Sequence, residues 1–374
     1  MEIYNLSLGA VFYRDPIDSP YYDKHEIFDF DKNPLNFRIF VENISAVGGA
    51  DTPEDWAGAF NLAKNLTWRN DSYKFIIHIA DANAHGRDWD NYDVYPNEGI
   101  KNDEIITYFA KNNFNIAGFK VGSGATKSYQ RAQQIFRENY NFNYFIKDFD
   151  DFYIEKNYFL DLVYESFQNS LYTAVTYGFD ISEEQSEINW DQVKGENNTD
   201  FVIIRAGIGN KTDSQFEKNY EGAKKLGIPV GIYWYANSSN SDGAKKEAEI
   251  CKNIIEGKKF EFPVYYVIEE QFIFDSEYQA DIIDNFCNQL TPLNYSCALS
   301  SKYDKLTSRF DSVISDYQIW VNYYGDDMPV LDNDWGIWKY NDTGKIKGIE
   351  GNVNLDLAIV NYTKATLDNH YNGY

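Results

Sequence analysis

The sequence predicts an α/β protein with two domains, residues 1–170 and 172–374, and a barrel of the TIM type in the second. The length of 374 residues is more than twice that of a typical domain of about 150 residues. The rhythm of apolar and polar residues also changes near residue 172. Beyond it, short apolar segments recur and amphipathic segments separate the early ones, which is typical of strands alternating with helices.

The second domain contains eight expected strands. Their near-continuous apolar character fits a parallel sheet covered by helices, and their number in so short a stretch favours a closed barrel. The strands are expected at 175–180, 201–207, 229–235, 263–269, 296–301, 317–324, 334–340 and 354–360. Apolar residues three and four apart predict helices at 215–226, 242–255 and 278–290.

The first domain has the same two element types, separated by long polar loops. An apolar strand is expected at 74–81 and a helix is expected to begin at 52–55. Asp51, Pro53 and the acidic residues after it are typical of a helix N-terminus. The last helices and strand of this domain are expected in the aromatic-rich stretch 129–164.

Composition excludes several classes of protein. The chain has 34 Lys and Arg against 58 Asp and Glu, a formal charge of −24, which disfavours nucleic-acid binding and adsorption on anionic membranes. No apolar run reaches the ~20 residues that span a bilayer. The N-terminal residues show no export signal, which leaves the compartment open between cytoplasm, secretion and phagosome. The three cysteines are interpreted as buried residues rather than a disulfide framework.

Polar residues at the ends of three expected strands are the first candidates for a site. They are Asp180, Arg205 and Glu269, and strand C-terminal ends carry the active sites of such barrels. Because side chains alternate along a strand, Glu269 shares a face with Tyr265 and Val267. A carboxyl group among aromatic rings suits general acid catalysis. The alternative is structural: the two acids pair with Arg205 or cap loops.

Aromatic residues near strand ends point to a carbohydrate ligand, because rings stack on sugar faces and phenols bind hydroxyls. The counter-argument is that a chain with 31 Tyr places tyrosine everywhere. The candidate binding residues are Arg205, Tyr233, Tyr235, Trp320, Tyr323, Trp338 and Asn354.

The second half resembles the lysozymes of glycoside hydrolase family 25. The resemblance is carried, in order, by the segments 178–182, 188–191, 201–207, 219–224, 227–233, 262–266, 320–323 and 351–355. It implies a (β/α)5(β)3 barrel, no metal or cofactor, and muramidase activity on peptidoglycan or a related amino-sugar glycan. It also implies that Asp180 is an active-site carboxylate and Glu269 the general acid.

The chain departs from the family pattern at its acids. Val267 replaces the Asp of Asp-x-Glu, and Asn354 replaces the Asp of Val-Asp-Leu-Asn. Trp234 stands for the His of Tyr-His-Tyr, and 184–186 for His-Gln-Gly. Glycoside hydrolysis divides its work between two carboxyl groups, so weak turnover is expected. The alternatives are a glycan-binding protein without turnover and a protein-interaction module built on the first half.

The first half resembles the von Willebrand factor A-type domain of the alpha-kinase group, through segments 9–15, 48–56 and 75–86. The resemblance implies a Rossmann-like fold, here incomplete because the family's first strand, with Asp-x-Ser-x-Ser, is absent. Thr52 and Asp81 match the later metal-site positions, and two ligands cannot complete an octahedral shell. No metal and no cofactor are therefore expected, and a protein partner is the alternative role for this half.

Overall fold

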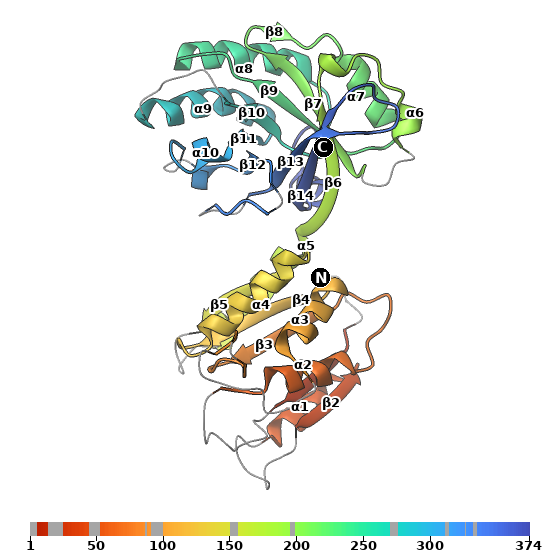
Figure 1. Cartoon of the computed structure of the whole chain (residues 1–374), viewed down its shortest axis with the longest axis vertical. Helices are drawn as coiled ribbons and strands as arrows, with labels where there is room; N and C mark the ends of the chain where they lie inside the picture. Colours follow the sequence, from red (N-terminus) through yellow and green to blue (C-terminus); the bar gives the residue numbers. More distant parts are fainter. Residues whose placement is uncertain are drawn as a thin grey trace. The chain divides into compact units, whose positions relative to one another are not determined.

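The computed structural model describes residues 6–13, 25–44, 53–86, 88–90, 100–149, 156–194, 199–269, 276–310, 314–325, 327–331 and 335–374. By its internal contacts the chain divides into two compact units, Met1–Leu171 and Tyr172–Tyr374 (Figure 1). Asp51 and Thr52, both considered in the sequence analysis, lie outside the described residues, as does Glu270. In the part that is described, no helix is long and apolar enough to cross a membrane.

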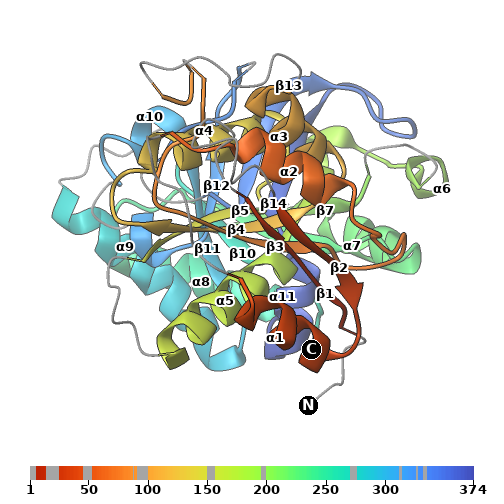
Figure 2. The same ribbon diagram turned by 90° about the horizontal axis from the view of Figure 1, so that it is seen from below.

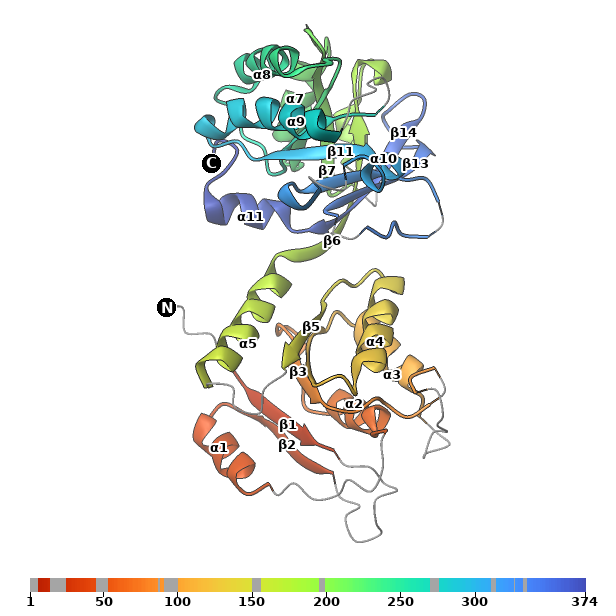
Figure 3. The ribbon, with the colours of Figure 1, turned by 90° about the vertical axis from the view of Figure 1, so that its left-hand side faces the viewer.

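The first unit contains a three-stranded parallel sheet in the order β3-β4-β5. Its α2, α3 and α4 lie on one face and α5 on the other (Figures 2 and 3). The strands are β3 (Phe75–Ala80), β4 (Asn115–Val121) and β5 (Tyr144–Phe149), and the helices α2 (Trp56–Lys64), α3 (Asn102–Lys111), α4 (Thr126–Glu138) and α5 (Lys156–Leu171). A separate antiparallel pair, β1 (Leu8–Phe12) and β2 (Glu26–Asp31), precedes α1 (Pro34–Glu42). The expected strand at 74–81 is thus present as β3.

The helix expected to begin at 52–55 begins instead at Trp56. Asp55 is its N-cap, and its carboxylate accepts a hydrogen bond from the Gly58 amide at 2.8 Å. Glu54 forms a bridge with Ala84, which holds the preceding backbone extended and delays the helix. Pro53 therefore lies before the helix and not in its first turn.

The second unit is a closed eight-stranded barrel, as the sequence predicted. Its strands are β6 (Thr173–Ile181), β7 (Phe201–Ile208), β9 (Val230–Tyr235), β10 (Val264–Val267), β11 (Cys297–Lys302), β12 (Ile319–Asn322), β13 (Ile337–Gly344) and β14 (Val353–Val360). The order runs β6-β14-β13-β12-β11-β10-β9-β7, and β6 pairs with β7 to close it. Only the pairings of β14 with its two neighbours are antiparallel among these barrel strands.

Helices cover the outside of the barrel, with α7, α8 and α9 around β7 to β11 (Figures 1 and 3). Their bounds, with those of the short elements, are β8 (Lys211–Thr212), α6 (Trp190–Val193), α7 (Phe216–Lys225), α8 (Ser241–Ile255), α9 (Ser276–Leu290), α10 (Tyr303–Leu306) and α11 (Tyr362–Asn369), with 3-10 turns η1 (Glu183–Gln185), η2 (Thr291–Leu293) and η3 (Ile314–Asp316). Buried side chains pack inside the barrel. They include Phe201, Tyr233, Tyr265, Val267 and Trp320.

Gly178 explains how the barrel closes beside the first acid of the site. It pairs with Phe201 across β6 and β7, and a Cβ at this position would lie 2.6 Å from the Phe201 carbonyl oxygen. A side chain there would push the two strands apart. The glycine therefore allows the closing contact and sets Asp180, two residues on, at the end of β6 on the same face of the strand.

The cysteines differ in part from the prediction. Cys287 at the end of α9 forms a disulfide with Cys297 at the start of β11, with their Cα atoms 5.4 Å apart. Only the fold brings the helix end back to the next strand. Cys251 is a buried free thiol, as expected.

Candidate active site

Two acids converge at the C-terminal ends of the barrel strands. Asp180 at the end of β6 is buried and accepts a hydrogen bond from Asn354 Nδ2 at 3.0 Å. Glu269 follows β10 by two residues, is partly buried, and accepts a hydrogen bond from Asn322 Nδ2 at 2.8 Å. The predicted strand end at 269 is wrong by two residues, because β10 ends at Val267. The pairing of Asn354 with Asp180 follows directly from the β6–β14 register.

A buried lysine lies among these acids and was not anticipated from the sequence. Lys339 on β13 places its Nζ 3.1 Å from Asp180 Oδ2 and 4.5 Å from the centre of the Trp320 ring. Asp356 on β14 pairs with Lys339 across the strands, and its Oδ1 accepts a hydrogen bond from Trp320 Nε1 at 2.8 Å. The sequence signal that could have revealed Lys339 and Asp356 is a charged residue at an inward position of an apolar strand. It occurs in both β13 and β14.

Burial dominates the electrostatics of the two aspartates. It raises the pKa of Asp180, while the Lys339 ammonium and the Asn354 amide act in the opposite direction. It raises the pKa of Asp356 well above the ordinary range, and the charge of Asp180 adds to that rise. The surrounding carboxyl groups raise the pKa of Lys339 in spite of its burial. Asp356 is therefore the acid that keeps its proton to higher pH.

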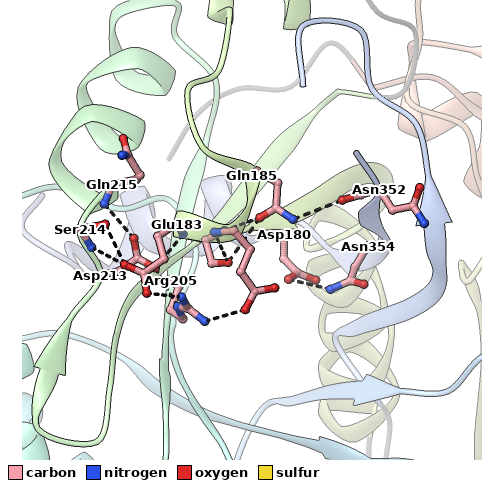
Figure 4. A network of polar contacts seen from close by, with 11 residues as sticks. Asp180, Glu183, Gln185, Arg205, Asp213, Ser214, Gln215, Asn352 and Asn354 are labelled. Carbon is pink, nitrogen blue, oxygen red and sulfur yellow. Dashed lines mark hydrogen bonds and ion pairs between the residues drawn. The ribbon is translucent and has the colours of Figure 1, made fainter. Parts of the chain in front are cut away.

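Arg205 is held in a network of ion pairs, so its guanidinium is not free to bind a substrate (Figure 4). Its Nε lies 2.7 Å from Asp213 Oδ2, and its other nitrogens lie 3.2 Å from Glu183 and 3.6 Å from Glu184. Asp213 also accepts a hydrogen bond from the Glu183 amide at 2.9 Å. The guanidinium thus ties the turn after β6 to the loop after β8. The prediction that Arg205 binds substrate does not agree with this placement.

The six predicted binding side chains other than Arg205 divide into two groups. Tyr233, Tyr235 and Trp320 point into the barrel, and Asn354 reaches Asp180. Trp320 has no exposed surface and Tyr233 is 8% exposed, so neither ring presents a free face on which a sugar could stack. Tyr235 is partly buried at the strand end.

Trp338 and Tyr323 lie on the opposite side of the barrel wall. Alternation sends Ile337 and Lys339 inward, so Trp338 faces outward, where its Nε1 donates to the Tyr323 carbonyl at 2.6 Å. The ring of Tyr323 packs against that of Tyr303, with centroids 4.8 Å apart. Their prediction as sugar-binding residues is at odds with this geometry. It rested on nearness to strand ends and did not consider the face.

Val267 occupies the position two residues before Glu269 and is 2% exposed in the barrel core. An apolar side chain there supplies neither charge nor a hydrogen bond. Within the described part of the chain, no cluster of three or more His, Cys, Asp or Glu is arranged to hold a metal ion. The arrangement therefore offers one carboxyl group partly open to solvent, Glu269, and one buried carboxyl paired with an ammonium, Asp180.

In barrels of this type the C-terminal ends of the strands carry the active site, and here they carry two acids. Residues 179–349 match the family described as Glycosyl hydrolases family 25. The second unit therefore contains a domain of this family.

Individual relatives match parts of the chain. An autolytic lysozyme of Clostridium acetobutylicum is 26% identical over 180 residues, which are 48% of this chain and 54% of that protein. The alpha-protein kinase vwkA of Dictyostelium discoideum is 41% identical over 92 residues, 24% of this chain and 15% of that protein. The modular autolysin LytC of Streptococcus pneumoniae is 26% identical, with a TM-score of 0.47, over 49% of this chain and 46% of that one. The chain thus spans about half or less of each.

Proposed function

We propose that the second unit is a lysozyme-type muramidase that cleaves peptidoglycan, with low turnover. The observation that carries the proposal is that Asp180 and Glu269 lie near enough to interact electrostatically at the C-terminal ends of the barrel strands, in a segment that matches glycosyl hydrolases family 25. Similarity to an autolytic lysozyme supports the choice of an amino-sugar glycan as substrate.

In this proposal Glu269 donates a proton to the glycosidic oxygen as its bond to the anomeric carbon breaks. Water then adds to that carbon, and the proton that it loses returns to Glu269. Asp180, as a carboxylate, stabilises the positive charge that develops on the anomeric carbon. Asn322 and Asn354 orient the two acids through their amide hydrogen bonds. Val267 stands where the family pattern has an Asp, so the site lacks that third carboxylate. This missing charge is the physical reason for low turnover.

The test is a turbidity and reducing-sugar assay of the full chain on purified peptidoglycan. The unmodified protein should release sugar slowly, and Glu269→Gln should abolish the release. Val267→Asp should raise turnover by about 10²–10³, the typical worth of one preorganised electrostatic contact.

Val267→Asn is the matched control, because it has the size of Asp without the charge. A polar side chain at this buried position costs stability, so thermal melting of both variants accompanies the assay. High turnover in the unmodified protein that is indifferent to Glu269→Gln would contradict the proposal.

A second candidate is glycan binding without hydrolysis. Two observations favour it: Val267 in the barrel core supplies no carboxylate, and the Lys339 ammonium offsets the negative charge of Asp180. Binding of a disaccharide of N-acetylglucosamine and N-acetylmuramic acid, measured by calorimetry without formation of products, would decide for this candidate.

For the first unit we infer a domain like von Willebrand factor A that engages a protein partner. Its parallel sheet between helices and the similarity of 24% of this chain to part of vwkA support this. Asp81 is exposed after β3. Capture of a partner by the full chain, lost when the exposed face of this unit is substituted, would support the role.

A further inference from the structure

Lys339 is a buried cation in the wall of the barrel. Only 7% of its surface is exposed, and its ammonium lies against the ring of Trp320. A lysine in such a place is stable only if it is neutral or paired. Its 3.1 Å contact with Asp180 Oδ2 supplies a pair.

The register of the barrel strands fixes this contact. Asn322, Lys339 and Asp356 stand side by side on β12, β13 and β14, and Asn354 stands opposite Asp180 on β6. The lysine on β13 therefore reaches Asp180 on β6 across the intervening strand β14. It is held by the sheet and does not depend on a mobile loop.

Asp356 is the deeper of the two acids. It has no exposed surface, its Oδ1 accepts the Trp320 indole hydrogen bond, and its Oδ2 has no hydrogen-bond partner among the described residues. An ionised carboxylate with one unpaired oxygen is costly at this depth, whereas a protonated acid is neutral. One ammonium cannot neutralise two carboxylates.

We propose that Lys339 is a positioning residue for the reaction proposed above: its ammonium holds Asp180 as a carboxylate at the mouth, while Asp356 beneath it holds a proton. The three side chains then carry no net charge. Glu269 remains outside this set and keeps its own partner, Asn322.

The charges around the group agree with this assignment. Burial raises the pKa of both aspartates; at Asp356 the charge of Asp180 adds to the rise, whereas at Asp180 the Lys339 ammonium is the largest opposing cause. The anionic neighbours of Lys339 raise its pKa, so it remains protonated. The titratable side chains that act on it or on which it acts are Asp180, Tyr233, Glu269, Tyr324 and Asp356.

This inference rests on the proposed function, in which Asp180 acts as a carboxylate. An ammonium beside Asp180 keeps it ionised but offsets its field at the anomeric carbon. Lys339 therefore sets the lowest pH at which the site retains its carboxylate.

The test follows the ionisation of Asp180 directly, by ¹³C NMR of the full chain labelled at aspartate carboxyl carbons. The Asp180 signal is identified by its loss in Asp180→Asn. Lys339→Met should move the titration of Asp180 upward by about 1–3 pH units, the usual effect of an adjacent opposite charge. Lys339→Arg should restore most of the original titration.

Lys347→Met is the matched control, because Lys347 is an exposed lysine shortly after the same strand. It should leave the titration unchanged. An Asp180 titration that is the same in a folded Lys339→Met variant overturns the inference.

Asp180→Asn carries the test if Lys339→Met does not fold. It leaves Asp356 as the nearest acid to the ammonium, so the titration of Asp356 should move downward. No movement overturns the inference. Because these readouts need no turnover, their failure would leave the muramidase proposal standing, and absence of lysis would leave the titration result standing.

Discussion

At the scale of single residues, two cations of similar burial, Arg205 and Lys339, differ in the acids that they contact. Arg205 is surrounded by Asp213, Glu183 and Glu184, and holds a turn in place. Lys339 is directed at Asp180, which we propose as an active-site carboxylate. Both are nearly inaccessible, so each acts through the acid it contacts.

Arg205→Leu is expected to destabilise the second unit by about 3–5 kcal/mol. The reason is that Asp213, whose side chain is fully buried, would lose its cation. Urea unfolding followed by intrinsic fluorescence measures the change.

The comparison is Lys218→Met, which removes an exposed ion pair with Glu187. Exposed pairs contribute about 0–1 kcal/mol, so its effect should be small. If Arg205→Leu were as mild as Lys218→Met and yet weakened glycan binding, Arg205 would be a ligand after all.

At the scale of elements, contact between a helix and its neighbour overrides helix propensity. Gly222 lies in α7, and a Cβ there would lie 2.3 Å from Trp190 in α6. Alanine is intrinsically better than glycine in a helix by about 1 kcal/mol. Overpacking costs about 1–3 kcal/mol, so the clash should win.

Gly222→Ala is therefore expected to lower the stability of the second unit. In a Trp190→Ala background Gly222→Ala should instead stabilise the second unit, because the clash is gone and only the higher helix propensity of alanine remains. A double-mutant cycle by urea unfolding tests the change of sign. Equal effects in the two backgrounds would mean that Trp190 does not constrain position 222.

At the scale of the whole molecule, the two units have separate cores, and the core of the first contains a buried histidine. His78 on β3 is buried against the rings of Trp56, Phe60 and Tyr129. Burial lowers its pKa from 6.5 to about 3. Between these values the unfolded chain binds a proton that the folded unit does not, so stability falls as pH drops below 6.5.

The first unit should therefore lose about 2 kcal/mol from this residue between pH 7 and pH 5. His78→Phe, which keeps an aromatic ring and removes the titration, should flatten this part of the pH dependence. Unfolding at the two pH values measures it, and the transition of the second unit serves as the internal control. If the unmodified protein and His78→Phe showed the same pH dependence, His78 would not be the group responsible for it.

The periodicity of the sequence was sufficient for the barrel, because alternation of apolar strands with amphipathic helices is a local property. The local motif Gly178-Phe-Asp180 likewise predicted an acid at a strand end, and Asp180 lies there. Tyr323 and Trp338 were predicted to bind sugar from their closeness to strand ends. That closeness does not say whether a ring faces the inside or the outside of the barrel. Bonds between distant segments, such as Cys287–Cys297, were beyond sequence spacing.

By itself the sequence determined the strand-and-helix order of the second unit, the charge balance, and the two acids Asp180 and Glu269. Tertiary structure alone decided that Lys339, more than 150 positions after Asp180, lies against it, and that Arg205 serves a neighbouring turn. The physical reason is that apolar patterning acts over a few residues. The pairing of buried charges depends on which strands become neighbours, and on their register when the barrel closes.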